Sequence, residues 1–174
     1  MATAIIITVS VLLLIVLIYL FFHYNNLEIS LRKEAEAQEN DISTVHDTMW
    51  KIIKEKAGVA EKYRDTFEKI YPELISGRYS NDGRNTMKWI EESNPDFDTS
   101  LYDSLMDSIS TQRTIFQRAQ KRMLDIVREH NTLIRRMPDR FFITDKSPID
   151  YVPITSDKTY DVMQTRVDNE ILEF

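Results

Sequence analysis

The residues that could do chemistry are few, and their spacing does not assemble a catalytic or metal site. The three histidines, His23, His46 and His130, lie far apart in the chain. Two metal ligands share one helical face in spacings such as Glu-x-x-His or His-x-x-x-His, and none of the three histidines has such a neighbour. His130 is flanked by Glu129 and Asn131 in the only local cluster. We expect His130 to have a structural role at a helix interface.

Other signatures of enzymes and cofactor sites are missing from the sequence. There is no Gly-rich phosphate loop and no Gly-x-Ser-x-Gly, and the acids between Asp145 and Asp161 lack the spacing of a calcium loop. The lack of cysteine excludes thiol nucleophiles, disulfides and Cys-ligated metals. Trp50 and Trp89 are expected to be anchors in the core or in an interface. The sequence therefore predicts a protein that is not an enzyme and holds no metal or cofactor.

Composition narrows the class further. The net charge is -6, from 22 Lys and Arg against 28 Asp and Glu, which makes nucleic acid an unsuitable partner. Only three Gly and five Pro occur in 174 residues. Such sparse helix breakers favour long, uninterrupted helices.

An unbroken apolar run, from Ala4 to Phe22, opens the chain. At about 1.5 Å of rise per residue, a helix of this length spans the hydrocarbon core of a bilayer, which is roughly 30 Å thick. A secretory signal peptide is the alternative. No basic residue precedes the run, however, and no small-x-small cleavage site follows it. We therefore expect residues 1–23 to be a single-pass transmembrane anchor.

The orientation of the anchor is predicted from its flanks. The first 22 residues contain no basic side chain, whereas Arg32 and Lys33 lie shortly after the run. By the positive-inside rule, the N-terminus should lie outside and the body in the cytoplasm.

After the apolar run, apolar or small residues recur at alternating steps of four and three, which is typical of helices that wrap around each other in a left-handed sense. This stripe comprises Leu27, Leu31, Ala35, Ile42, Val45, Met49, Ile52, Ala60, Tyr63, Phe67, Ile70 and Leu74. Gln38 and Lys56 interrupt it without shifting its phase. The pattern predicts one helix over about 24–75, although Gly58 weakens it and Pro72 should kink or end it near Tyr71.

Two further helices are predicted. Turn-forming residues fill 76–83, a short helix follows over about 84–93, and Asn94-Pro95 marks its end. A second long helix is expected over about 98–137. Its apolar stripe comprises Leu101, Leu105, Ile109, Phe116, Ala119, Met123, Ile126, Leu133 and Met137.

The two long helices bury their stripes most simply by lying antiparallel. The fold class is therefore all-α, with an N-terminal transmembrane helix that continues into a long-helix antiparallel bundle or coiled coil. This arrangement returns the basic end of the second helix toward the bilayer, where it could contact anionic lipid or simply be a solvated cluster. The basic residues are Arg128, Arg135, Arg136 and Arg140.

The tail, residues 139–174, is expected to be an extended chain that packs aromatic residues on the bundle of residues 24–138. Its apolar residues near the prolines are Phe141, Phe142, Ile143, Tyr151, Val152 and Ile154. Farther on, Met163, Val167, Ile171 and Phe174 are spaced as in an amphipathic helix, which would complete the bundle or dock on a partner.

The order of these features resembles the LemA family of membrane-anchored bacterial proteins. The resemblance is carried by a Tyr-Asn-x-Leu motif after the anchor, by Glu-x-x-Pro, and by x-Asn-x-x-Ile-x-x-x-Pro at the end of the last helix. The matching residues here are Tyr24, Asn25, Leu27, Glu92, Pro95, Asn131 and Pro138. The family's Arg-x-Asp-Leu-Ile-Pro-Asn-Leu stretch is replaced here by residues 47–53. The resemblance implies an anchored helical bundle and no particular activity.

Three functions are compatible with these features. The first is a non-enzymatic scaffold or adaptor that binds an unidentified membrane or envelope protein or forms a homo-oligomer. The second is a signal-transducing or regulatory subunit, in which Gln38 and Lys56 are the points that change. The third is a phage-encoded envelope or lysis protein with the opposite orientation.

Overall fold

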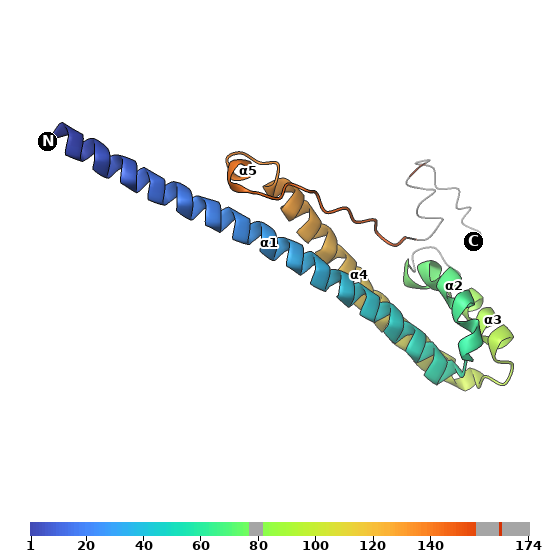
Figure 1. Cartoon of the computed structure of the whole chain (residues 1–174). Coiled ribbons are helices and arrows are strands. Elements are labelled where there is room, and N and C mark those ends of the chain that lie inside the picture. The colour runs from blue at the N-terminus through green and yellow to red at the C-terminus, as the bar shows by residue number, and fades with distance from the viewer. Residues whose placement is uncertain (77–81, 156–163, 165–174) are drawn as a thin grey trace, which may run out of the picture. The chain divides into compact units, whose positions relative to one another are not determined.

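A computed structural model describes residues 1–76, 82–155 and 164 of the chain. All regular structure in these residues is helical, so the all-α fold class is confirmed (Figure 1). The helices are α1 (Ala2–Ala57), α2 (Arg64–Ser76), α3 (Asp82–Ser93), α4 (Tyr102–Leu133) and α5 (Asp139–Phe142). Short 3₁₀ turns, Glu61–Tyr63 and Thr99–Leu101, precede α2 and α4.

The chain forms two compact units. Unit 1 combines residues 1–40 with 121–151, and unit 2 combines residues 41–120 with 152–174. Helices α1 and α4 each contribute one part to either unit.

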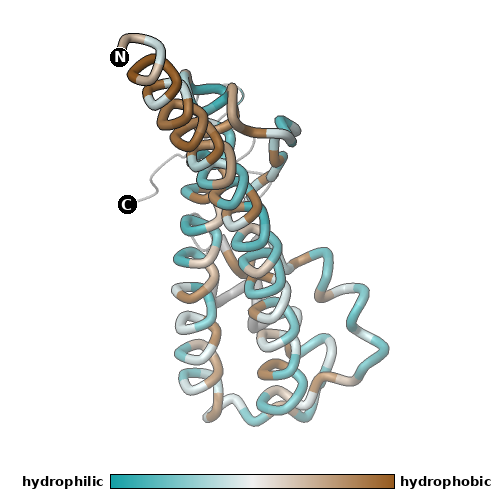
Figure 2. The backbone as a smooth tube through the Cα atoms, turned by 60° about the vertical axis from the view of Figure 1, so that its left-hand side comes forward, coloured by the Kyte–Doolittle hydropathy of each residue, from teal (hydrophilic) through white to brown (hydrophobic). Residues whose placement is uncertain are grey.

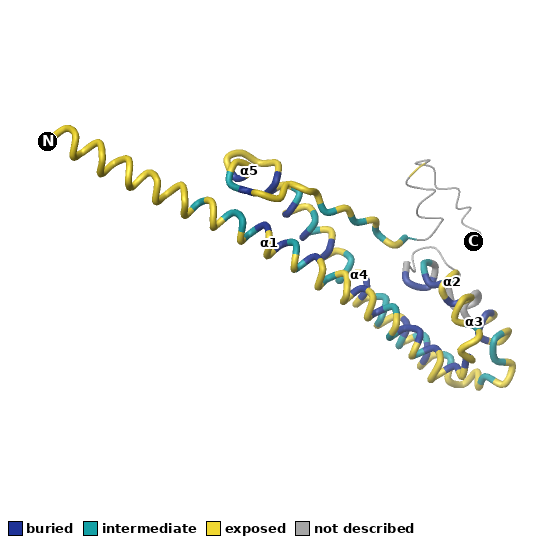
Figure 3. Tube along the Cα trace, viewed as in Figure 1, coloured by how far each residue is buried: buried dark blue, intermediate teal, exposed yellow. Residues whose placement is uncertain are grey.

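The first part of α1 carries the apolar run on its surface. It is the one helix in the described residues that is long and apolar enough to cross a membrane, and none of its apolar window is buried in the protein. Most of the large side chains from Ile5 to Phe22 are exposed on every side of the helix (Figures 2 and 3). An exposed apolar surface of this length fits a membrane span.

Unit 1 is built on an antiparallel pair formed by α1 and α4. Glu28 contacts His130, and Glu34 farther along α1 contacts Arg122 farther back along α4. The apolar core beside these contacts consists of Leu31, Leu133, Ile134 and Ile143, with Tyr24 and Leu27 packed against it. Ile143 belongs to the segment after α5, so the tail completes this core.

Unit 2 packs α2, α3 and the remaining parts of α1 and α4 around a larger core. Aromatic rings line up through it, since Trp50 lies 5.2 Å from Phe67, and Tyr71 lies 6.1 Å from Phe116. The Nε of Arg113 donates to the carbonyl of Leu74 at 2.9 Å, which satisfies one of the last carbonyls of α2.

The predicted single helix over 24–75 is wrong, because α1 ends at Ala57 and α2 begins at Arg64. Gly58 has a left-handed backbone with φ 64°, which is the usual conformation just past a helix end. The Nδ2 of Asn94 donates to the carbonyl of Ala57 at 2.9 Å. Pro72 does not end the helix near Tyr71, because α2 continues to Ser76, where burial of Leu74 and Ile75 offsets the lost hydrogen bond.

The apolar stripe of α1 changes its phase near the end of the helix. After Met49 the stripe continues at steps of four with the buried Ile53 and Ala57, Trp50 beside it is also buried, and the predicted Ile52 is only partly buried. A straight helix with 3.6 residues per turn drifts away from a strict 3.5 repeat in this way. In α4 six of the predicted residues are buried, namely Leu105, Ile109, Phe116, Met123, Ile126 and Leu133.

The ends of the second long helix differ from the expected 98–137. Helix α4 begins at Tyr102 and ends at Leu133, which leaves the predicted stripe residues Leu101 and Met137 exposed. Met137 precedes a proline, and this position disfavours the helical backbone. The short helix α3 begins at Asp82, two residues before the expected start.

The tail differs in part from the expected extended chain. Its first residues form the short helix α5, and residues 143–155 follow without regular structure. Ile143 is buried as expected, but Phe141 and Val152 are exposed. The predicted terminal helix with Met163, Val167, Ile171 and Phe174 lies outside the described residues.

Candidate functional site

A polar cluster with a buried centre joins α1, α4 and the tail within unit 1. We define it as Glu28, Arg32, His130 and Asp145. Glu28 and His130 are only 3% and 0% exposed, although both have ionisable side chains. The Oε1 atom of Glu28 lies 2.6 Å from Nη2 and 2.9 Å from Nε of Arg32, and 3.0 Å from Nε2 of His130. Because a carboxylate is an acceptor only, His130 donates from Nε2 in this arrangement.

Arg32 extends the cluster to the tail. Its Nη2 atom donates to the carbonyl of Ser147 at 3.2 Å and lies 3.2 Å from Oδ2 of Asp145. Asp145 also accepts from the hydroxyl of Ser147 at 2.6 Å and from its backbone N–H at 2.9 Å. These hydrogen bonds lower the pKa of Asp145, and the positive charge of Arg32 lowers it further.

Two asparagines fix the tail on either side of this cluster. The side chain of Asn131 donates to the carbonyl of Ile149 at 2.9 Å and accepts from its N–H at 3.0 Å. Asn25 accepts from the N–H of Thr144 at 3.0 Å and donates to the carbonyl of Phe142. Each amide therefore pairs with the backbone in both directions, which satisfies groups that the irregular tail leaves without a ladder.

Tyr24 makes a third contact with this part of the tail. Its ring stacks on Phe142 at 5.8 Å between centroids. A hydrogen bond with Asp139 is the main cause that raises the pKa of Tyr24, and burial and the charge of Asp139 add to it. Asp139 is itself buried and lies 2.6 Å from Nη2 of Arg136.

The polar side chains of the cluster and of the two asparagines have hydrogen-bond partners within the protein. The Glu28 carboxylate faces an arginine and a histidine, and the two asparagines face the backbone. Within the described ranges, His, Cys, Asp and Glu form no group of three that could hold a metal ion. The arrangement can therefore lock two helices and the tail together, and this is what its chemistry supports.

A groove of about 350 Å³ lies beside the cluster in unit 1. Its apolar side consists of Leu27, Leu31 and Leu133. Its polar side consists of Asp125, Arg128, Glu129, Thr132 and Arg136. Arg128 is paired with Asp125, and Arg136 is paired with Asp139. The groove thus has no cation left over for an anionic ligand.

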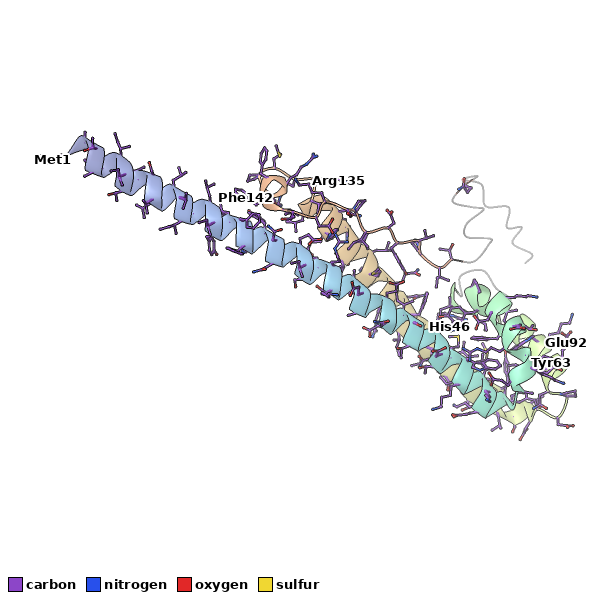
Figure 4. The ribbon with its side chains drawn as sticks, in the orientation of Figure 1. Met1, His46, Tyr63, Glu92, Arg135 and Phe142 are labelled. Carbon is purple, nitrogen blue, oxygen red and sulfur yellow. The ribbon has the colours of Figure 1, made fainter. Side chains whose placement is uncertain are left out.

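The four predicted basic residues fall into two classes. Arg128 and Arg136 form the ion pairs just described, so they are engaged within the protein. Arg135 and Arg140 are exposed and have no ion pair with any residue in the described part of the chain. The structure therefore leaves Arg135 and Arg140 as the available charges (Figure 4 labels Arg135).

The residues that carry the LemA resemblance are divided between the two units. Five lie together in unit 1 around the tail, namely Tyr24, Asn25, Leu27, Asn131 and Pro138. Glu92 and Pro95 belong to unit 2, where Glu92 is 3.9 Å from Lys88 and Pro95 follows α3.

Sequence reasoning missed Glu28, Arg32 and Asp145. The sequence does contain a feature that could have predicted the burial of Glu28, since this residue lies between Leu27 and Leu31 on the apolar side of the helix. His130 occupies the gap between Ile126 and Leu133 in the stripe of α4. An acid and a histidine on two facing stripes predict a buried pair once the register of the antiparallel helices is known.

Comparison with known proteins found no relative of this chain. No family model matches the chain, and neither does a curated protein or a solved structure. The likeness to the LemA family therefore stays a prediction from the motifs.

Proposed function

We propose that the chain is a single-pass, membrane-anchored and non-enzymatic helical scaffold or adaptor. One observation carries the proposal. The exposed apolar run passes without a break into the rest of α1, which contributes to the cores of both units. A helix that is apolar on all sides favours insertion in lipid, and the body attached to it would then be held at the membrane.

The site supports a structural function. Its buried charges are paired, and its asparagines fix the tail on the helices directly after the apolar run. These contacts would hold unit 1 in one position relative to the anchor. The likeness to LemA proteins agrees with this proposal, since that family also implies an anchored bundle.

The anchor is tested by extraction of membranes at alkaline pH. The natural chain should stay in the pellet, because removal of an apolar helix from lipid is highly unfavourable. A Leu13→Arg/Val16→Arg variant should appear in the supernatant, since each arginine near the bilayer centre costs about 3 kcal/mol. Ile29→Arg, an exposed position after the run, is the matched control and should stay in the pellet. Release of the natural chain would contradict the proposal.

The scaffold function is tested by crosslinking in membranes, followed by purification of the tagged chain in detergent. We expect a defined partner or a homo-oligomer, which should be lost with the Leu13→Arg/Val16→Arg variant. A chain that is crosslinked to no partner and to no second copy would argue against a scaffold.

A regulatory subunit is the second candidate, and the length of α1 favours it, because a shift of the apolar run could pass along one helix to Ala57. Of the two predicted points of change, only Gln38 lies partly buried on the stripe. Lys56 is exposed, and its amine lies 2.7 Å from the hydroxyl of Ser108. Disulfide trapping tests this, with Gln38→Cys combined in turn with a second engineered cysteine at successive positions of α4, because the chain has no cysteine of its own. A switch should give two sets of crosslinked positions and a scaffold a single set.

A further inference from the structure

The segment after α4 forms a corner, defined here as residues 134–142, that lies at the end of the apolar run. The carbonyl of Phe142 accepts from Asn25, and Asn25 follows Phe22 by three residues, or about 4.5 Å along the helix. Apart from α1 itself, α5 is the helix of unit 1 that reaches farthest toward the N-terminus of α1 (Figures 1 and 4). The corner therefore lies where a bilayer surface would be if α1 spans it.

Two large apolar side chains are exposed on this corner. Met137 is 60% exposed and Phe141 is 73% exposed. The next two apolar residues are packed against the protein instead, since Phe142 stacks on Tyr24 and Ile143 is buried in the core. The tail thus has apolar residues that complete the protein and others that the protein leaves uncovered.

The charges on the corner match an anionic surface. Arg135 precedes Met137 and Arg140 directly precedes Phe141 in the sequence, and neither arginine has an ion pair in the described residues. The nearby acid, Asp139, is buried and paired with Arg136. Exposed apolar side chains that alternate with unpaired arginines are typical of segments that lie in the interface of a membrane.

We propose that the corner is a second membrane contact, in which Met137 and Phe141 enter the interface and Arg135 and Arg140 bind phosphate groups of anionic lipids. This inference rests on the proposed membrane anchor. Its occupant is the bilayer because the corner is continuous with the apolar run and carries the complementary charge. The contact would fix the depth of α1 and hold unit 1 against the membrane surface.

Single cysteines test the contact in the full-length chain, which has no cysteine of its own. An environment-sensitive fluorophore is attached at Met137→Cys or Phe141→Cys in vesicles of phosphatidylcholine and phosphatidylglycerol. Both positions are exposed, so the label disturbs no core. Lys121→Cys is the aqueous control, because it lies level with Glu34, about 18 Å beyond Phe22. Leu14→Cys reports on the anchor itself.

The proposal expects blue-shifted emission and quenching by lipid-attached nitroxides at 137 and 141, and quenching by iodide at 121. Iodide quenching at 137 and 141 equal to that at 121 would overturn it, and would leave the corner free for a protein partner. The probe at Leu14 separates the two proposals: if it is lipid-exposed while the corner is aqueous, only the corner inference fails. If Leu14 is also aqueous, the anchor fails as well.

The arginines are tested with the Phe141 probe. Arg135→Gln/Arg140→Gln should lower the inserted population, by about fivefold for each arginine, and should abolish its dependence on phosphatidylglycerol. Arg118→Gln/Lys121→Gln, which removes two exposed charges away from the corner, should have no effect. An unchanged dependence on anionic lipid in the corner variant would contradict the assigned role of Arg135 and Arg140.

Discussion

At the scale of single residues, the buried pair of Glu28 and His130 is the feature with the largest expected effect. Glu28→Ala removes the carboxylate that accepts from Arg32 and from Nε2 of His130, and this nitrogen of a fully buried side chain loses its acceptor. Breaking a buried pair in this way costs about 3–5 kcal/mol of stability. Urea unfolding of the full-length chain in detergent, followed by circular dichroism, measures this loss.

The matched control is Glu34→Ala, which breaks the exposed pair with Arg122 on the same two helices. It should cost less than about 1 kcal/mol. A double variant, Glu28→Leu/His130→Leu, should recover most of the stability, because apolar residues can replace a buried pair. Equal losses for Glu28→Ala and Glu34→Ala would show that the buried pair is not a lock.

The pKa of Asp145 offers a second test at this scale. Ser147→Ala removes the hydroxyl that is the main cause of the lowered pKa, so the pKa of Asp145 should rise toward its ordinary value. A lowered pKa in the folded chain means that the carboxylate stabilises the fold at neutral pH. This stabilisation is lost as the pH falls through the folded pKa. Carboxyl NMR titration measures the pKa directly.

Ser100→Ala is the reciprocal control, since Ser100 lowers the pKa of Asp98 in unit 2. Each substitution should shift only its own aspartate. The stabilities of the natural chain and of Ser147→Ala should differ at neutral pH and converge at acid pH, where Asp145 is protonated in both. A difference that persists at acid pH would point to another function of Ser147.

At the scale of helices, the effect of Gly58→Ala on stability tests whether α1 ends at Ala57, because the substitution would stabilise a continuous helix and destabilise a helix end. If one helix continued past residue 58, Gly58→Ala would stabilise it by about 1 kcal/mol. In the structure Gly58 has φ 64°, and an added Cβ would lie 2.8 Å from Nδ2 of Asn94. Gly58→Ala should therefore destabilise unit 2 by about 1–2 kcal/mol, measured by thermal unfolding. A stabilised variant would favour the continuous helix.

The asparagines give a second test at this scale. Asn131→Ala removes both hydrogen bonds to Ile149, so the amide of Ile149 should exchange with solvent much faster. Asn131→Asp keeps the acceptor of the Ile149 N–H and loses the donor, and it should give an intermediate rate. The amide of Thr144, which is bound by Asn25, should change little. Unchanged exchange at Ile149 would mean that other contacts hold the tail.

The helices show what the sequence predicts and what it does not. The apolar run was predicted because it is continuous over several turns, and the stripe of α4 was predicted with most of its buried residues because it is periodic. The break at Gly58 was missed because it depends on Asn94, which is 36 residues away in the sequence and supplies the cap. The polar cluster was missed for the same reason. Glu28, His130 and Asp145 become neighbours only when the register of α1 and α4 and the path of the tail are fixed.

At the scale of the whole molecule, neither unit is a continuous piece of the chain. Each unit contains part of α1 and part of α4, and the tail passes from unit 1 to unit 2 between Tyr151 and Val152. No single cut between elements would therefore release an intact unit. The proposed anchor and the proposed scaffold function are therefore best studied in the whole chain.

At the same scale, the orientation of the chain in the membrane distinguishes a scaffold with a cytoplasmic body from a phage envelope or lysis protein. The absence of basic residues before the run, with Arg32 and Lys33 after it, predicts a cytoplasmic body. Val152 is 85% exposed, so Val152→Cys offers a single reactive thiol in a chain without cysteine. In intact bacterial cells an impermeant maleimide should not label it, and lysis should expose it.

A cysteine before the run, Thr3→Cys, is the opposite control and should be labelled in intact cells. Labelling at residue 152 but not at residue 3 would place the body outside, as the phage envelope or lysis protein requires. It would also place Arg135 and Arg140 at the outer leaflet, and their charge would then meet the anionic lipids of that side. The orientation thus decides which membrane surface, and which set of partners, the proposed scaffold would face.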